Sequence, residues 1–212
     1  KAEWPTDRWE KFSPRELNGS TVGLVGYGSI GREVARLLRP FNVTVLAVKR
    51  DVMHPQDNGY IVPGYGDPEG DYFHRLYPIE ALKSMLRECD YVVVTLPLTP
   101  HTRAIIGEEE FKAMKPGAYL VHVSRGGVVD EDALLRALTE KRLAGAAVDV
   151  FSNEPLPPEH PLWKAPRLII TPHVSGFSQV YKERAGIMFA DNLKRYLRGE
   201  PLLNEYLPDR HY

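Results

Sequence analysis

The stretch STVGLVGYGSIG, residues 20–31, joins a strand signal to a turn signal. A run of β-branched and apolar residues enters a glycine cluster with the spacing G-x-G-x-x-G. Apolar residues then recur at helical spacing until Pro40, which ends the pattern because proline cannot donate the next helical hydrogen bond. These residues are Ile30, Val34, Leu37 and Leu38. The stretch therefore predicts a strand, a tight turn and a helix in direct succession.

The three glycines suit a turn whose backbone approaches a phosphate group. In such a unit the first glycine permits the tight turn, the second admits a pyrophosphate, and the third lets the helix pack on the strand. The helix N-terminus adds N–H groups that lack partners. A tight turn without a ligand is the alternative, but three glycines cost backbone entropy, which favours a dinucleotide site. Its predicted residues are Gly26, Tyr27, Gly28, Ser29, Ile30 and Gly31.

Downstream of this unit, apolar runs alternate with amphipathic segments. The pattern predicts strands at 43–48, 91–98, 118–124, 146–151 and 167–173, and helices at 78–90, 108–117, 130–145 and 178–199. Solid apolar strands between helices are typical of a parallel sheet covered on both faces. We therefore expect an α/β fold with a Rossmann-type, doubly wound parallel sheet. Residues 51–77 lack a period and predict an irregular excursion, in which GYGDPEG (64–70) would be a flexible loop.

The composition is ordinary for a globular protein. Of 212 residues, 43% are hydrophobic and 26% are charged, and a formal net charge of −1 gives no reason to expect nucleic acid as a partner. No apolar run reaches the roughly 18 residues of a membrane span, so no membrane is expected. The single cysteine, Cys89, excludes an intrachain disulfide and fits a reducing compartment, which favours a cytoplasmic location. No metal site is predicted.

Four further blocks carry a resemblance to a known family. They are TLPLTPHT (95–102), VSRGGVVDEDAL (123–134), AAVDVFSNEPLPPEHPLW (146–163) and TPHVSG (171–176). With the glycine motif they keep the order found in D-isomer-specific 2-hydroxyacid dehydrogenases, and residues 17–178 resemble the coenzyme-binding domain of that family. The resemblance implies a hydride transfer between NAD(P)H and a 2-keto or 2-hydroxy acid of the glyoxylate, hydroxypyruvate or phosphoglycerate type.

The family match assigns three catalytic residues, Arg125, Glu154 and His173. A planar guanidinium such as that of Arg125 can pair with a substrate carboxylate through two parallel bonds. An imidazole such as that of His173 titrates near neutral pH and can give or take the proton, and Glu154 would orient it. Singly, each is more often a surface charge or a loop residue. Together, after three strands of one parallel sheet, they would face the crevice where ligands bind.

The resemblance also assigns residues to the cofactor. Asp149 matches a carboxylate that contacts the nicotinamide amide, and the motif context favours this role over the alternative of a helix-capping aspartate or one at the edge of the core. Leu96, Pro97 and Thr102 match a segment beside the adenosine and its ribose. The remaining residues assigned to the cofactor are Val123, Ser124, Arg125, His173 and Gly176.

The second predicted strand ends in two cations, in VTVLAVKRDV at 43–52. Lys49 follows Gly31 by 18 residues, close to the separation of about 20 at which an acidic residue binds the ribose in NAD enzymes. Lys49 and Arg50 would instead attract a 2′-phosphate, which favours NADP over NAD. In the alternative, both are solvated charges and Asp51 binds the ribose of NAD.

The family pattern divides the chain into three parts. Residues 1–16 would link two lobes, 17–178 would form the NAD(P)-binding Rossmann domain, and 179–212 would be a C-terminal helix and tail that pack on a substrate lobe. Relatives carry that N-terminal lobe, of about a hundred residues, but this chain does not contain it. The chain is therefore expected to be a piece of a longer protein or a reduced homologue. Relatives pair through their coenzyme domains, so a homodimer is expected.

Two other functions remain open at this stage. Transcriptional corepressors share the fold and the Arg/Glu/His set, so a cofactor-sensing interaction module is one alternative. A phosphite dehydrogenase-like enzyme is another, since it uses the same set. Formate dehydrogenases carry glutamine where Glu154 stands, which argues against that activity.

Overall fold

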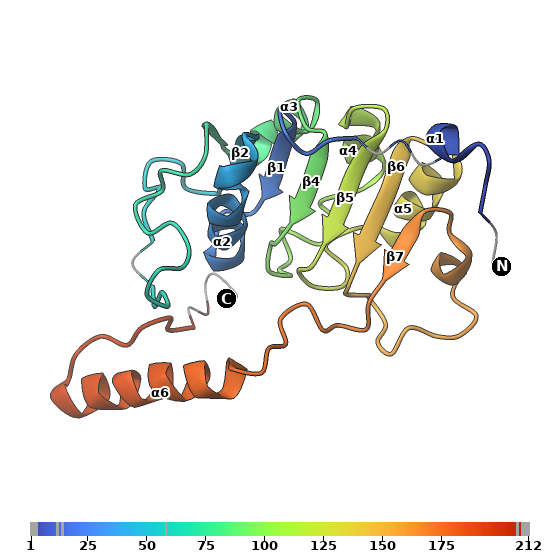
Figure 1. The fold of residues 1–212 in the computed structure, drawn as a ribbon. Helices are drawn as coiled ribbons and strands as arrows, with labels where there is room; N and C mark the ends of the chain where they lie inside the picture. Colours follow the sequence, from blue (N-terminus) through green and yellow to red (C-terminus); the bar gives the residue numbers. More distant parts are fainter. Residues whose placement is uncertain (1–3, 12, 14, 58, 207, 209–212) are drawn as a thin grey trace.

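A single parallel sheet organises the chain (Figure 1). The computed structural model describes residues 4–11, 13, 15–57, 59–206 and 208. In these residues the seven strands lie in the order β3-β2-β1-β4-β5-β6-β7, and every neighbouring pair is parallel. From β1 the chain continues through β2 to the edge strand β3. It then crosses to β4, on the other side of β1, and continues through β5 and β6 to β7. This arrangement confirms the predicted doubly wound α/β fold.

The elements agree with the predicted alternation of strands and helices. The strands are β1 (Thr21–Val25), β2 (Thr44–Val48), β3 (Arg75–Tyr77), β4 (Tyr91–Val94), β5 (Ala118–His122), β6 (Leu143–Val148) and β7 (Leu168–Ile170). The α-helices are α1 (Arg8–Lys11), α2 (Ser29–Leu38), α3 (Leu82–Leu86), α4 (Glu108–Ala113), α5 (Glu131–Thr139) and α6 (Tyr181–Arg198). Short 3₁₀ helices are η1 (Arg39–Phe41), η2 (Ile79–Ala81) and η3 (Pro161–Lys164).

Two apolar layers cover the two faces of the sheet. One layer contains Val25, Met85 and Phe111, so it joins β1 to α3 and α4. The other contains Leu24 and Ala35, so it joins β1 to α2. Because successive strand residues point to opposite faces, a strand buried on both sides must be apolar throughout. This is why the predicted strands appear as continuous apolar runs.

Several predicted boundaries are wrong. Residues 51–77 are not irregular to their end, because Arg75–Tyr77 form the edge strand β3 paired with β2. The strand predicted at 91–98 ends at Val94. The helix predicted at 130–145 ends at Thr139, and β6 already begins at Leu143, three residues before the predicted start. Hydrogen bonds to neighbouring strands set the boundaries of the strands, and apolar periodicity does not report them.

The last helix, α6, extends away from the sheet (Figure 1). None of its residues is buried, and its large apolar side chains are exposed at Ile187, Phe189, Leu193, Tyr196 and Leu197. Such a face fits the predicted packing of 179–212 on another lobe, and the proposed domain boundaries stay predictions. Residues 1–3, 12 and 14 of the predicted linker, and 207 and 209–212 of the tail, lie outside the described residues. Within the described part, no helix is long and apolar enough to cross a membrane.

Candidate active site

The glycine loop has the shape that a phosphate group requires. Gly26 adopts φ +110°, a conformation that residues with side chains avoid. A Cβ atom at Gly31 would lie 2.2 Å from the carbonyl oxygen of Gly26, so only glycine fits there. At Gly28 nothing lies within 4 Å of the corresponding position. Gly28 is also the N-cap of α2 and provides no side-chain cap, so the helix N-terminus faces open space beside the turn.

A cavity of about 700 Å³ opens at this turn. It lies where β1 and β4 neighbour each other, the switch point at which open α/β sheets bind ligands. Eight of the predicted cofactor residues line it: Gly26, Tyr27, Gly28, Lys49, Arg50, Leu96, Pro97 and Thr102. Ser29 and Ile30 stand exposed at the start of α2, whereas Gly31 is buried. The cradle at Gly28 and this cavity together suit a dinucleotide.

Threonine hydroxyls fix the wall that follows β4. Thr95 donates to the carbonyl oxygen of Gly26 at 2.9 Å and so joins this wall to the glycine loop. Thr102 donates to the carbonyl oxygen of Pro97 at 2.6 Å, which holds the turn between them. The Thr102 hydroxyl therefore stabilises the turn at residues 97–102 that forms this wall, while Leu96 and Pro97 provide its apolar surface.

The predicted acid–base pair consists of residues that follow β6 and β7. Nδ1 of His173 lies 2.7 Å from Oε2 of Glu154, and both side chains are partly exposed. The other carboxylate oxygen accepts the amide of Phe151 at 2.7 Å. Burial opposes ionisation of Glu154, but the hydrogen bonds from His173 and Phe151 outweigh it and lower the pKa of the carboxyl. The ionised carboxylate can therefore accept a hydrogen bond from the ring N–H and orient the imidazole.

Arg125 stands on a loop that touches the loop of Glu154. Its side chain is exposed, and Nη1 donates to the carbonyl oxygen of Ser124 at 2.8 Å. A Cβ atom at the next residue, Gly126, would lie 1.9 Å from the carbonyl oxygen of Phe151, so the two backbones are in close contact. The structure thus brings the arginine loop beside the glutamate loop. The roles of the three residues stay predictions.

Asp149 lies beneath the histidine loop. It is 2% exposed, and its carboxylate accepts the Thr171 hydroxyl at 2.5 Å and the amides of Val174 and Ser175 at 2.9 Å each. Its carbonyl oxygen accepts the amide of His173 at 2.9 Å. Burial opposes ionisation, but these hydrogen bonds lower the pKa of Asp149 to about 2. Asp149 therefore holds the turn that carries His173, and its predicted contact with the nicotinamide stays a prediction.

The other residues assigned to the cofactor differ in their surroundings. Ser124 is buried, and its hydroxyl lies 3.2 Å from Nδ1 of His122. Burial lowers the pKa of His122 to about 4, so this histidine is neutral at physiological pH. Val123 is partly buried, and Gly176 is exposed with nothing within 4 Å of its Cβ position. Ser124 thus has its partner inside the domain.

Sequence reasoning missed the part of the cavity formed by the excursion. Gln56 and Asp57 line the cavity, as does Arg32 from α2. The expectation that 64–70 is a flexible loop is wrong, because Asp67 within it is 1% exposed and accepts hydrogen bonds from four groups. No sequence signal indicated this arginine, because Arg32 shares its helix face with Ser29, Arg36 and Arg39 and so resembles a solvated charge.

Comparison with known families and proteins identifies the family to which this chain is similar. Residues 1–175 match the family model described as D-isomer specific 2-hydroxyacid dehydrogenase, NAD binding domain. Glyoxylate reductase from Thermofilum pendens is 36% identical over 201 residues, which cover 92% of this chain and 55% of that protein. The chain thus spans about half the length of the curated relatives it matches.

Two solved structures show the same architecture. A D-isomer specific 2-hydroxyacid dehydrogenase from Xanthobacter autotrophicus Py2, in complex with NADPH and MES, gives a TM-score of 0.79 at 32% identity, covering 97% of this chain and 81% of that one. An NAD-dependent formate dehydrogenase from Staphylococcus aureus, in complex with NAD, gives 0.74 at 30% identity, covering 96% and 56%. The resemblance inferred from the sequence blocks is confirmed: the chain belongs to the D-isomer specific 2-hydroxyacid dehydrogenase family and contains its NAD-binding domain.

Proposed function

We propose that the protein is an oxidoreductase that transfers a hydride between NAD(P)H and a 2-keto or 2-hydroxy acid. The observation that carries the proposal is the 2.7 Å contact between Nδ1 of His173 and Oε2 of Glu154. It lies at the carboxyl edge of the sheet that also holds the glycine cradle and its cavity. A carboxylate that orients an imidazole is the arrangement that general acid–base catalysis requires.

The chain's own residues divide the remaining work. When bound, the nicotinamide supplies the hydride. His173 gives a proton to the carbonyl oxygen during reduction and takes it back during oxidation, while Glu154 stabilises the protonated ring. Arg125 pairs with the carboxylate of the acid through its guanidinium. The amides at the start of α2, beside Gly28, would hold the pyrophosphate.

The substrate class is a small 2-keto acid of the glyoxylate, hydroxypyruvate or phosphoglycerate type. The glyoxylate reductase among the relatives supports this class. The test is a panel of these acids with the unmodified protein and with His173→Ala. We expect His173→Ala to lower kcat by about 10²–10⁴-fold, the usual contribution of a general acid, with nearly unchanged affinity for the dinucleotide. An equal loss of turnover and dinucleotide affinity would show that His173 is structural.

For the cofactor we propose NADP in preference to NAD. Lys49 and Arg50 line the cavity directly after β2, where a 2′-phosphate would lie. Nζ of Lys49 donates to the carbonyl oxygens of His54 and Gln56, which holds this ammonium at the cavity wall. Calorimetric titration of both cofactors tests the choice. Tighter binding of NADPH than NADH, with the preference reduced in Lys49→Asp, would support it, and equal affinities in the unmodified protein would refute it.

We also propose a homodimer in a cytoplasmic setting, with a substrate lobe completing the site. The exposed apolar face of α6 supports the presence of a packing partner for residues 179–212. The match covers 55% of the glyoxylate reductase, which leaves room for such a lobe in that relative. Cell fractionation tests the location.

A further inference from the structure

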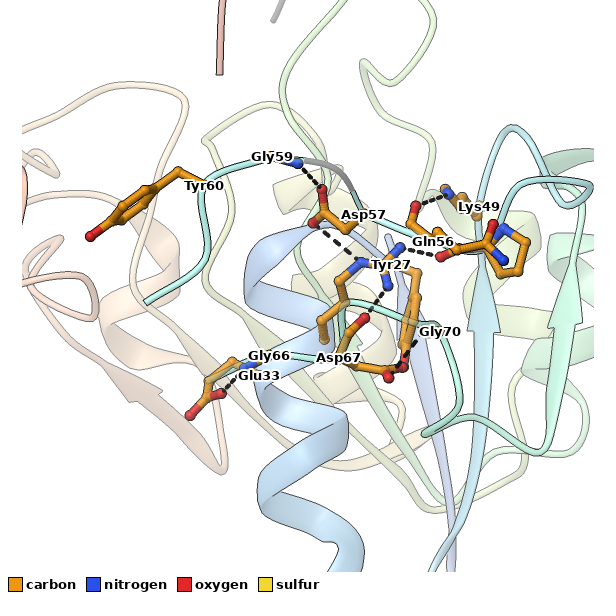
Figure 2. A network of polar contacts seen from close by, with 12 residues as sticks. Tyr27, Glu33, Lys49, Gln56, Asp57, Gly59, Tyr60, Gly66, Asp67 and Gly70 are labelled. Atoms are coloured by element: carbon orange, nitrogen blue, oxygen red, sulfur yellow. Dashed lines mark hydrogen bonds and ion pairs between the residues drawn. The ribbon is translucent and has the colours of Figure 1, made fainter. Parts of the chain in front are cut away.

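Residues 51–72, here called the cover segment, fold onto the glycine loop (Figure 2). Asp67 is their anchor. Its carboxylate accepts the Tyr27 hydroxyl at 2.5 Å and the amides of Gly70, Asp71 and Tyr72 at 2.9–3.1 Å. Tyr27 is itself part of the glycine motif, and burial together with Asp67 raises the pKa of its hydroxyl, which stays protonated as the donor. The cover segment is therefore attached directly to the predicted cofactor turn.

Arg32 joins both halves of the cover segment to α2. This side chain is 2% exposed and stacks on the Tyr27 ring at 4.8 Å. Its two terminal nitrogens donate to the carbonyl oxygens of Asp67 and Pro55. Its Nε has no hydrogen-bond partner and lies 3.4 Å from Oδ2 of Asp57. A buried guanidinium needs a counter-charge, and Asp57 provides it.

Asp57 is held at the wall of the cavity. Its amide donates to the carbonyl oxygen of Pro68 at 2.9 Å, and its Oδ1 accepts the amide of Gly59 at 3.0 Å. The side chain is 23% exposed and lines the cavity together with Lys49 and Arg50. Asp57 thus places a fixed carboxylate in the corner where the two cations follow β2.

A carboxylate in this corner distinguishes the two cofactors. In NAD enzymes an acidic residue about 20 positions after the motif accepts the ribose hydroxyls, and a negative charge there repels a 2′-phosphate. Here the strand end is cationic, and the carboxylate comes from the cover segment, 26 residues after Gly31. We propose that Asp57 is the residue of this chain that disfavours a 2′-phosphate and so limits the preference set by Lys49 and Arg50. This inference rests on the proposed dinucleotide-dependent function and adds a specificity residue to it.

Asp57→Asn tests the proposal with little change in shape. The affinities of NADPH and NADH would be measured by calorimetry, together with those of adenosine 2′,5′-bisphosphate and 5′-AMP. The second pair differs only in the 2′-phosphate and lacks the nicotinamide, so it reports on this corner alone. We expect the affinity ratio in each pair to shift toward the 2′-phosphate by about tenfold, because one nearby like charge is removed. An unchanged ratio would overturn the proposal.

Two control variants separate charge from folding. Glu69→Gln removes an exposed carboxylate of the same segment that does not line the cavity, and it should leave both ratios unchanged. Asp57→Glu keeps the negative charge, so the affinity ratio in each pair should stay within about threefold of its value in the unmodified protein. If Asp57→Asn merely loosened the cover segment, both members of each pair would bind more weakly in equal measure, which would also overturn the proposal.

Different measurements test the proposed function and the role of Asp57. The ratio of NADPH to NADH affinity in the unmodified protein tests the preference for NADP, and the panel of keto acids tests the reaction. The change of the ratio on replacing Asp57 tests only the role of this carboxylate. A protein that prefers NADH, or that reduces no 2-keto acid, would refute the proposed function, yet a shift in the Asp57→Asn ratio would still support the specificity role.

Discussion

Replacing Asp149 by asparagine tests whether this carboxylate holds the turn that carries His173. The carboxylate accepts a hydroxyl and two amides from residues 171–175, and it is nearly inaccessible to solvent. Asparagine has almost the same shape, but its NH₂ group replaces one of the two carboxylate oxygens that accept these hydrogen bonds. The change should therefore leave two donors facing each other and remove the ionic component of the network.

The size of the effect follows from the pKa. The pKa of Asp149 falls from 3.8 to about 2 in the folded protein. At about 1.36 kcal/mol for each pKa unit, ionisation of Asp149 stabilises the fold by roughly 2 kcal/mol at neutral pH. For a chain of this length, 1 kcal/mol corresponds to about 2–4 °C in Tm. We therefore expect Asp149→Asn to unfold roughly 4–8 °C below the unmodified protein at pH 7.

The pH dependence provides a second measurement. Because the folded pKa lies below the unfolded one, the stabilisation is fully present well above pH 3.8 and is lost as the pH falls through about 2. The difference in Tm between the two proteins should thus stay constant from pH 7 to about pH 5 and shrink below about pH 4. Thermal scans by circular dichroism across this range measure it. Asp71→Asn, at an exposed carboxylate, is the matched control and should change Tm little.

Two results would refute this reasoning. One is a decrease in Tm of less than about 1 °C, because a stabilisation of ~2 kcal/mol corresponds to a decrease of roughly 4–8 °C. The other is a difference in Tm that persists unchanged at pH 3. If Asp149→Asn instead weakened dinucleotide binding without affecting Tm, the carboxylate would act on the nicotinamide, as the family resemblance implied, and the positioning role would be wrong.

The remaining predictions concern the glycine loop and the assembly. Gly31→Ala should destabilise the protein by roughly 1–3 kcal/mol and abolish dinucleotide binding, because its Cβ would lie 2.2 Å from the carbonyl oxygen of Gly26; wild-type calorimetric affinity would contradict the geometry. Multi-angle light scattering of the protein should give the mass of a homodimer, and a monomer at micromolar concentration would count against pairing through the coenzyme domain.

Much of the fold follows from local sequence. The spacing of Gly26, Gly28 and Gly31 between a strand and an amphipathic helix defines the turn, since Gly26 has a positive φ and Gly31 lies against the carbonyl oxygen of Gly26, five residues earlier. Asp130 is likewise of a residue type that favours a helix N-cap, and its carboxylate accepts the amide of Ala133 at 2.9 Å. Alternation of apolar strands with helices then predicted the parallel sheet. These features are local, so they can be recognised before any tertiary contact is known.

The tertiary structure alone decided the other features, because their partners are distant in sequence. The short strand β3 exists through its pairing with β2, and three residues carry no periodicity. Asp67 and Tyr27 are 40 residues apart, so nothing near GYGDPEG indicated a buried anchor. Asp149 has its hydrogen-bond donors 22 to 26 residues away, which its own neighbours could not reveal. Local sequence sets the backbone conformation of each segment, but burial and charge depend on which distant segments the fold brings together.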